Sequence, residues 1–272
     1  MNQMATRASA DPAVVRDRAQ PAPGPRVPMM SAITAVASGQ LSRVRVARGP
    51  LLFVATVQSL GLVVLLRGVV HHHDLATGSA VVAGSTILVI GFVGLNLLAQ
   101  RFGTLRASTA LDYYAALPIP LAAVVIGTAA SYASFAVPGA VVTSVVGVWL
   151  YGLPAANLWV VIPAAIAAAL ALAGVGAAIG LALPRPELAT VAGQLGMTLV
   201  LFLGIIPPSH LPTVARALRV LVPGALAVDA YAAALRGAPD WTGVVVRLVA
   251  TVIYGVLALA LAARMFRRAV DR

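Results

Sequence analysis

Residues 158–183 read LWVVIPAAIAAALALAGVGAAIGLAL, an apolar run that contains no charged residue. A helix needs about 20 such residues to cross a hydrocarbon core that is about 30 Å thick. Comparable runs recur at residues 51–70, 79–100, 121–150, 188–206 and 244–263. Their length favours helices, because the strands of a membrane barrel give shorter segments of alternating hydrophobicity. The sequence therefore predicts an all-α integral membrane protein with six transmembrane helices.

The overall composition supports the same class of protein. Of the 272 residues, 60% are hydrophobic and only 10% are charged, and the mean hydropathy is +0.95. A soluble domain has about 25% charged residues, so the soluble enzyme classes are largely excluded. The chain has no Cys, which excludes disulfides and thiolate metal sites. All 19 of its Lys+Arg residues are Arg, and without Lys there is no P-loop, so we expect no cofactor bound by this chain.

The arginines are distributed unequally between the two sides of the predicted bundle. Fourteen of the 19 fall on the side of the N-terminus, and five fall on the other side: Arg67, Arg216, Arg219, Arg236 and Arg247. Because positive loops stay inside, both termini are predicted to be cytoplasmic. An arginine surplus in a membrane protein sets orientation and attracts anionic membrane lipids, so we expect no nucleic-acid partner. Arg used throughout in place of Lys is typical of GC-rich genomes, which favours a bacterial plasma membrane.

Two N-terminal segments precede the first predicted span. Residues 1–28 are polar, rich in Pro and Ala, and contain no apolar run, so we expect a disordered cytoplasmic tail. Residues 29–48 have a helix-compatible pattern that ends in clustered arginines. This pattern is typical of an interfacial helix at the lipid headgroups, although a juxtamembrane linker fits equally well. The membrane domain is therefore predicted to cover residues 29–272.

Small and polar residues inside the spans indicate where helices or a substrate come close. Gly176 and Gly180 have small-xxx-small spacing, which permits close approach of a neighbouring helix. Three amides lie within the predicted spans: Gln58, Asn96 and Gln194. An amide in hydrocarbon must find a hydrogen-bond partner, so these side chains either line a substrate path or bond to another helix.

The connection between the second and third predicted spans, RFGTLRASTALDYYAALP at residues 101–118, is amphipathic and cytoplasmic. Pro118 and Pro120 stop a helix before the next span begins. A short cytoplasmic helix of this kind can dock into a groove on a soluble partner. Alternatively, it is an interfacial anchor whose Tyr113 and Tyr114 lie in the aromatic belt of the membrane. Periodicity alone leaves both interpretations open.

The connection at residues 207–240, on the outer side, is too apolar for a free loop. Pro223 and Gly224 divide it into residues 211–221 and 225–235, each long enough for a helix but too short to span. Irregular backbone at membrane depth must be covered by protein, so we predict a re-entrant helical hairpin before the sixth span.

Asp229 lies in the second half of this outer segment and is predicted to be the most deeply placed acid in the chain. An acid within the membrane usually pairs with a cation, and Arg216 and Arg219 are the available partners. Direct contact with a substrate is the alternative.

His71, His72 and His73 stand directly before Asp74 in the first outer loop. Such side chains can bind zinc or copper, but adjacent residues do not easily all face one ion. A short exposed turn explains them equally well, so we expect no metal site.

The order of three stretches resembles the type-2 ABC export permeases, which include the antibiotic-resistance permeases of actinobacteria. These stretches are residues 103–105 with 111–118, then 207–212 with Pro223 and 229–237, and finally 262–268. One departure is that family members often have acidic residues where this chain has Gln100 and Arg101. Members also often have a basic residue after the Pro, where this chain has Ile119, Pro120 and Leu121.

The resemblance implies the permease subunit of an ATP-driven exporter, which is not itself an enzyme. It implies a hydrophobic or amphipathic cargo, such as a drug, lipid, glycan or peptide, and a second permease copy or a paralogous permease. It also implies a separate ATPase subunit that binds ATP and Mg. The residues that it assigns to coupling with that ATPase are Gly103, Thr104, Leu105, Arg106, Asp112, Tyr113 and Tyr114.

Other kinds of membrane protein fit the sequence less well. An ion-coupled secondary transporter needs an ionisable residue near the bilayer midplane, and the predicted spans have no Asp, Glu, His or Lys at mid-span. The same spans offer no base to activate a nucleophile, as an intramembrane hydrolase requires. A secondary transporter and a non-transporting membrane anchor subunit remain the alternatives to the exporter.

Overall fold

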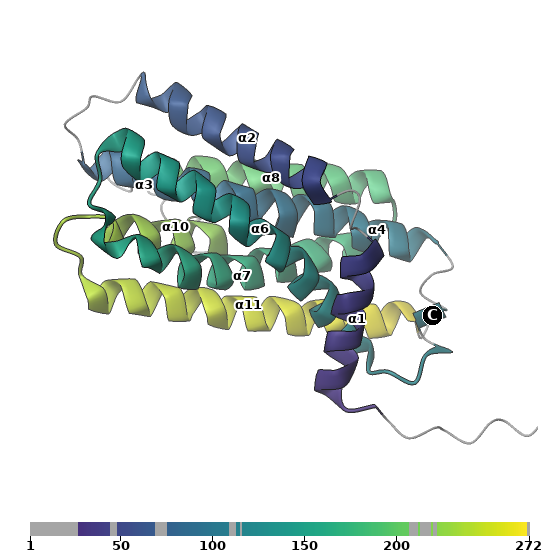
Figure 1. Ribbon diagram of the computed structural model, residues 1–272. Coiled ribbons are helices and arrows are strands. Elements are labelled where there is room, and N and C mark those ends of the chain that lie inside the picture. Colours follow the sequence, from purple (N-terminus) through teal and green to yellow (C-terminus); the bar gives the residue numbers. More distant parts are fainter. Residues whose placement is uncertain are drawn as a thin grey trace, which may run out of the picture.

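The computed structural model describes residues 27–43, 48–68, 75–108, 113–114, 116–206, 212, 219 and 222–270. Within these ranges all regular structure is helical (Figure 1). The helices are α1 (Met29–Arg43), α2 (Arg48–Arg67), α3 (Leu75–Gly91), the π-helical η1 (Phe92–Leu97), α4 (Leu98–Ala107), α6 (Leu121–Tyr151), the 3-10 helix η2 (Ala155–Val160), α7 (Val161–Ala182), α8 (Pro186–Ile205), α10 (Pro223–Ala234) and α11 (Trp241–Val270). The predicted all-α class is confirmed.

Six helical segments are long and apolar enough to cross a membrane, as the sequence predicts. They are Gly49–Arg67, Leu75–Ala107, Leu121–Tyr151, Ala155–Ala182, Pro186–Ile205 and Trp241–Val270. The second of these is continuous through α3, η1 and α4, and its most apolar window is 89% buried. The corresponding window of α2 is only 17% buried. The second span is therefore a central element of the bundle, whereas α2 lies on its periphery.

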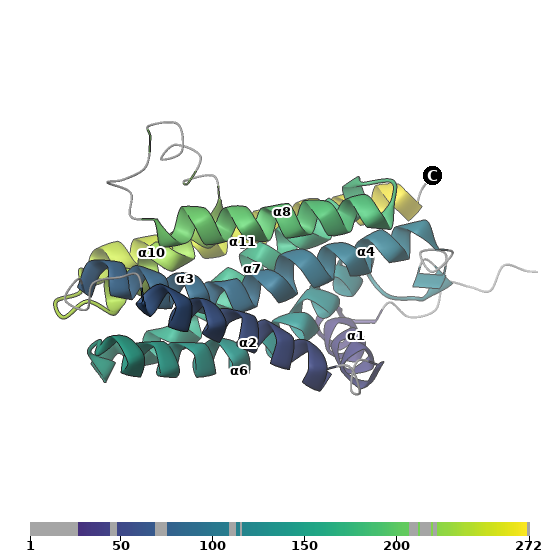
Figure 2. The same cartoon turned by 90° about the horizontal axis from the view of Figure 1, so that it is seen from above.

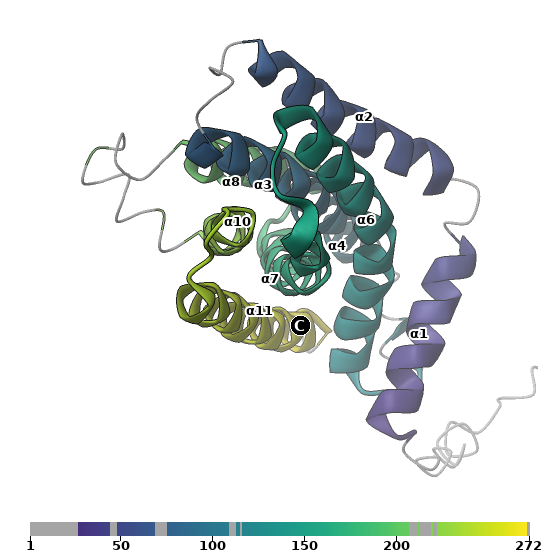
Figure 3. The ribbon, with the colours of Figure 1, turned by 60° about the vertical axis from the view of Figure 1, so that its left-hand side comes forward.

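Glycines let the central helices come close together. A Cβ atom on Gly176 would meet the carbonyl oxygen of Gly94 in η1, and one on Gly180 would meet that of Ala99 in α4. The close approach predicted from the small-xxx-small spacing is thus confirmed, and its partner is the second span. Figure 3 shows α7 in the middle of the bundle, with α6, α10 and α11 around it.

The two ends of the bundle differ in composition. We call one end the terminal end, because α1, the end of α4 and the end of α11 lie there, and the other the α10 end (Figures 1 and 2). All three tryptophans, Trp149, Trp159 and Trp241, lie at the α10 end. The rings of Trp159 and Trp241 stack with centroids 5.9 Å apart. Such aromatic residues are typical of a membrane–water boundary.

The second span is longer than the predicted residues 79–100, because the helix begins at Leu75 and continues to Ala107. Arginine is a good helix former, so Arg101 and Arg106 do not by themselves end a helix. The extra turns at residues 101–107 pack against α7 and α8. Gly103, Thr104, Leu105 and Arg106 therefore belong to a spanning helix rather than to the connection after it.

The short helix α1 crosses the bundle at its terminal end instead of running along it (Figure 3). It packs against α6, where a Cβ on Gly127 would meet the carbonyl oxygen of Ile33 and the side chain of Val36. The absence of a side chain at Gly127 thus lets the two helices cross closely.

Several sequence predictions concern residues that lie outside the described ranges. These are most of the predicted tail, the run His71–His73, Asp112 and Arg216, and most of the first half of the predicted hairpin. Only Pro212 and Arg219 are described between residues 207 and 221.

Candidate functional site

The terminal end of α4 carries four of the predicted coupling residues, and two of them are buried. A Cβ on Gly103 would meet Ala189 and Pro186 at the start of α8, and Leu105 is only 3% exposed. Both residues therefore hold α4 against its neighbours and are not accessible to a soluble partner.

Arg106 also makes its contacts within the chain. Its Nη1 donates hydrogen bonds to the carbonyl oxygens of Leu181 and, at 3.4 Å, Leu183, at the end of α7. These carbonyls have no partner within their own helix, and the negative end of the helix dipole favours a cation there. Arg106 thus fixes the end of α4 to the end of α7.

Two of the predicted coupling residues are exposed at this end. Thr104 is exposed, and its hydroxyl donates only to the carbonyl of Gln100 in its own helix, at 2.9 Å. Tyr113 is 58% exposed and lies edge-on to Tyr114, with ring centroids 5.6 Å apart. Thr104 and Tyr113 are therefore the described coupling residues that a partner can reach most readily.

Tyr114 connects the predicted coupling segment to α1. It is buried, and its hydroxyl accepts a hydrogen bond of 3.3 Å from Nε2 of the buried Gln40. A cavity of about 250 Å³ lies beside this contact, lined by Ala32, Ala35, Val36, Gly39, Gln40, Tyr113, Tyr114, Leu117 and Ile119. Gln40 has no local signal in the sequence, because its partner lies 74 residues away.

The three amides within the spans are not brought together. Asn96 is buried in η1 and accepts a hydrogen bond of 3.1 Å from Nε2 of Gln100. Gln58 on α2 and Gln194 on α8 are exposed on the outside of the single chain. A substrate path within one copy therefore does not contain all three.

At the α10 end, Arg219 forms an ion pair with Asp229 of α10, which confirms the predicted pairing. Arg219 Nε lies 3.1 Å from Asp229 Oδ2, and the Arg219 side chain is only 6% exposed. The same guanidinium donates at 2.6 Å to the carbonyl of Ile206 and at 3.5 Å to that of Gly204, where α8 ends. One arginine thus joins α10 to the end of α8.

The helix α10 is short, apolar and held on several sides. Pro223 is at its first turn, where a missing N–H costs nothing, and a Cβ on Gly224 would meet the Val200 side chain of α8. Tyr231 is fully buried and shares a hydrogen bond with Ser144 of α6. Both contacts fix α10 inside the bundle.

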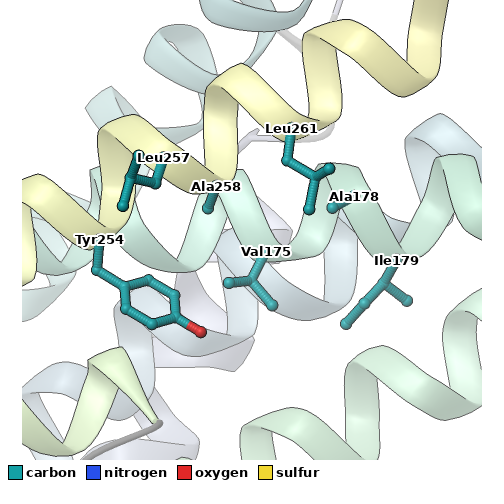
Figure 4. Close-up of a pocket in the computed structure, with 7 residues that line it drawn as sticks. All are labelled: Val175, Ala178, Ile179, Tyr254, Leu257, Ala258 and Leu261. Atoms are coloured by element: carbon teal, nitrogen blue, oxygen red, sulfur yellow. The ribbon is translucent and has the colours of Figure 1, made fainter.

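An apolar cavity of about 340 Å³ opens between α7 and α11 (Figure 4). Its lining residues are Val175, Ala178, Ile179, Tyr254, Leu257, Ala258 and Leu261. Leu257 and Leu261 are largely exposed, so the cavity faces the medium around the bundle. It can accommodate hydrocarbon and offers one hydroxyl.

The fold and these sites define a multi-pass membrane protein whose polar contacts hold helices together. Comparison with family models identifies residues 33–235 as an ABC-2 type transporter domain. The chain therefore belongs to the ABC-2 type transporters, as the membrane permease subunit, which has no ATP-binding site of its own. Members of this family normally work with an ATPase subunit. A comparison with curated proteins gives no match.

Proposed function

We propose that this permease exports a hydrophobic or amphipathic cargo out of a bacterial cell, powered by a separate ATPase subunit. The observation that supports this most is the family match over a six-span bundle that carries exposed Thr104 and Tyr113 at one end. In this proposal the ATPase docks at the terminal end, and it binds the ATP and Mg.

The terminal end would face the cytoplasm. Eight described arginines lie at this end, in helices or, for Arg185, directly before α8: Arg43, Arg48, Arg101, Arg106, Arg185, Arg264, Arg267 and Arg268. Four lie toward the α10 end: Arg67, Arg219, Arg236 and Arg247. The positive-inside rule then gives both termini a cytoplasmic position, with α1 lying along the interface and α10 entering the membrane from the opposite side.

In this proposal Tyr113 contacts the ATPase, and Tyr114 transmits the movement of the ATPase to α1. A movement imposed on Tyr113 reaches α1 through the hydrogen bond that Gln40 donates to Tyr114, and it reaches α6 through the connection at Pro120. Arg106 would keep the end of α4 fixed to α7 during that movement.

The translocation path would lie between two copies rather than within one. Gln58 and Gln194 are exposed on spans, and an amide that faces hydrocarbon lacks a hydrogen-bond partner. A second copy, or a paralogous permease, would cover both amides and let them line a path. The mostly aliphatic outer faces of α2 and α8 suit a hydrophobic or amphipathic cargo.

The test is co-purification of the tagged chain in mild detergent, scored for a P-loop ATPase. We expect the ATPase with wild type and with Trp149→Arg, and its loss with Tyr113→Arg. Trp149 is the matched control, since it is an aromatic residue 80% exposed at the opposite end of the bundle. Retention of the ATPase by Tyr113→Arg would place the docking surface elsewhere.

Export itself is measured as ATP-dependent extrusion of the hydrophobic dye Hoechst 33342 from cells that express the permease and its ATPase. A P-loop lysine variant of the ATPase is the control, and it should abolish extrusion. Extrusion that persists with this variant and collapses with the proton gradient would favour the secondary transporter. ATPase binding without any transport would favour the anchor subunit.

A further inference from the structure

The apolar cavity between α7 and α11 (Figure 4), which we call the α7–α11 groove, continues the space that α10 occupies. The helix α10 packs against both α8 and α11, whereas these two long helices hardly touch each other directly. Figure 1 shows α10 beside only part of α11, away from the terminal end. The groove is lined by α7 and α11 alone, so no described helix fills this space beyond α10.

Successive turns of α7 show where the cover provided by α10 ends. Leu172 is 1% exposed, and a Cβ on Gly224 in the first turn of α10 would lie 3.3 Å from its side chain. Val175 and Ile179 lie three and seven residues further along α7, so they share the face of Leu172. Both are only partly buried, and both line the groove. The groove therefore begins directly beyond the first turn of α10 and runs toward the terminal end.

The depth of the groove places it in one half of the membrane. Trp241 marks the membrane boundary at the α10 end, and Tyr254 follows it by 13 residues, or about 20 Å along the helix. The midplane of a hydrocarbon core of about 30 Å lies about 15 Å from that boundary, so Tyr254 is already past it. Leu261 lies about 30 Å from Trp241, at the opposite boundary. The groove is thus open to the leaflet at the terminal end.

The face of α11 that lines the groove continues into arginines. Leu257, Leu261, Arg264 and Arg268 are spaced by four, three and four residues, which puts them on one face of the helix. Leu257 is 65% and Leu261 53% exposed, and both arginines are exposed. Among the described residues no acid pairs with Arg264. Helical side chains lean toward the N-terminus of their helix, which directs Arg264 back toward Leu261 and the end of the groove.

We propose that one phospholipid of the leaflet at the terminal end binds here, with an acyl chain in the groove and its phosphate at Arg264. The cavity of about 340 Å³ is as large as a small-ligand pocket, and its lining is aliphatic apart from Tyr254. A hydrocarbon chain fills such a lining without placing a polar group in it. The guanidinium matches phosphate oxygens in pairs. The cavity makes this a defined site for one chain, and the site does not depend on export.

The experiment measures binding of dioleoyl phosphatidylglycerol to the delipidated full-length permease in detergent, by native mass spectrometry. We expect Ala178→Phe to weaken binding at least about tenfold, because the ring and an acyl chain cannot occupy the same volume. Ala260→Phe is the matched control, an exposed alanine of α11 outside the groove, and should bind like wild type. Arg264→Gln should weaken binding about threefold, since an exposed ionic contact is lost.

Tyr254→Phe tests the chemical class of the ligand. A hydrocarbon chain offers no hydrogen-bond acceptor to the tyrosine hydroxyl, so this variant should bind phosphatidylglycerol like wild type. A loss as large as that of Ala178→Phe would show that a polar group occupies the groove and would overturn the assignment to an acyl chain.

Crosslinking locates the lipid without any substitution. Phosphatidylglycerol that carries a diazirine in its acyl chain should attach to wild type within residues 175–179 and 254–261. Crosslinks spread evenly over all exposed spans would overturn the proposal, because they would show only general contact with the membrane.

A thermal unfolding series separates binding from folding. Ala178→Phe should unfold no lower than wild type in lipid-free detergent, because its ring fills a cavity. Added phosphatidylglycerol should raise the unfolding temperature of wild type and of Ala260→Phe but not that of Ala178→Phe, since a ligand stabilises only the state that binds it. Equal lipid binding by wild type and Ala178→Phe would overturn the proposal. A variant that binds lipid normally but alters the association of copies would make the groove a contact between copies.

Discussion

Arg219 at the α10 end and Arg106 at the terminal end both bind the end of a spanning helix, but their surroundings differ. Each donates to carbonyl oxygens where a spanning helix ends, Arg219 at α8 and Arg106 at α7. Only Arg219 is also paired with an acid, and it is nearly fully buried, whereas Arg106 is half-buried and has carbonyl partners alone. The α10 end is therefore held by stronger contacts, and relative movement of helices is expected at the terminal end.

The largest effect is expected from Arg219→Ala. The substitution leaves the half-buried Asp229 without its cation and removes the donors to the carbonyls at the end of α8. Breaking a buried pair in this way costs about 3 kcal/mol or more of unfolding free energy. The measurement is unfolding of the purified permease in mixed micelles with increasing denaturing detergent.

Two controls show whether this loss comes from the ion pair. Arg236→Ala removes an exposed arginine at the same end and should leave the stability unchanged. The double variant Arg219→Ala with Asp229→Ala should be more stable than Arg219→Ala alone, because no charge is left unpaired. An Arg219→Ala variant as stable as Arg236→Ala would remove the difference between the two ends.

Arg106→Ala is expected to have a smaller effect of about 2 kcal/mol, since it removes charge-assisted hydrogen bonds without leaving an unpaired acid. The same denaturation assay measures it, with Arg185→Ala as the exposed control at the same end. A loss larger than that of Arg219→Ala would reverse the comparison and make the terminal end the more strongly held one.

The contrast between the two arginines also shows what the sequence could predict. The pair of Arg219 and Asp229 was predictable, because both residues lie in one apolar segment, only 10 residues apart. The six spans were predictable too, since length and hydrophobicity decide them. Arg106 instead bonds to Leu181, 75 residues away, so its role as a helix-fixing residue had no local signal.

The second span extends beyond its predicted end for the same reason. Arg101 and Arg106 suggest a loop when charge is taken as a sign of water. Here the bundle itself supplies the carbonyl partners of Arg106, and Gly103 lets α8 come close, so the helix continues. The burial of Leu105 and Tyr114 also has no local signal, because it depends on packing within the bundle, such as the contact of Tyr114 with Gln40 of α1.

Tyr114→Phe tests whether the terminal end transmits movement to α1. It removes only the hydroxyl that accepts the hydrogen bond from Gln40, so the expected loss of stability is about 1 kcal/mol. If Tyr114 transmits movement to α1, ATP-driven transport should fall further than this loss explains, while the ATPase still binds. Gln40→Leu should give the same transport defect, and the double variant should add little to it. Additive transport defects would mean that the two residues act separately.

The smallest effect on stability belongs to Gln194, which lies between the two ends on the exposed face of α8. No described residue bonds to its side chain, so Gln194→Leu should change the unfolding free energy by less than about 0.5 kcal/mol. If a second copy covers this face, the same substitution should weaken association in vesicles about threefold, the usual value of one hydrogen bond between membrane helices. Energy transfer between labelled copies measures this, with Val249→Leu on the exposed face of α11 as control. A variant that loses stability but associates normally would place the amide's partner within its own chain.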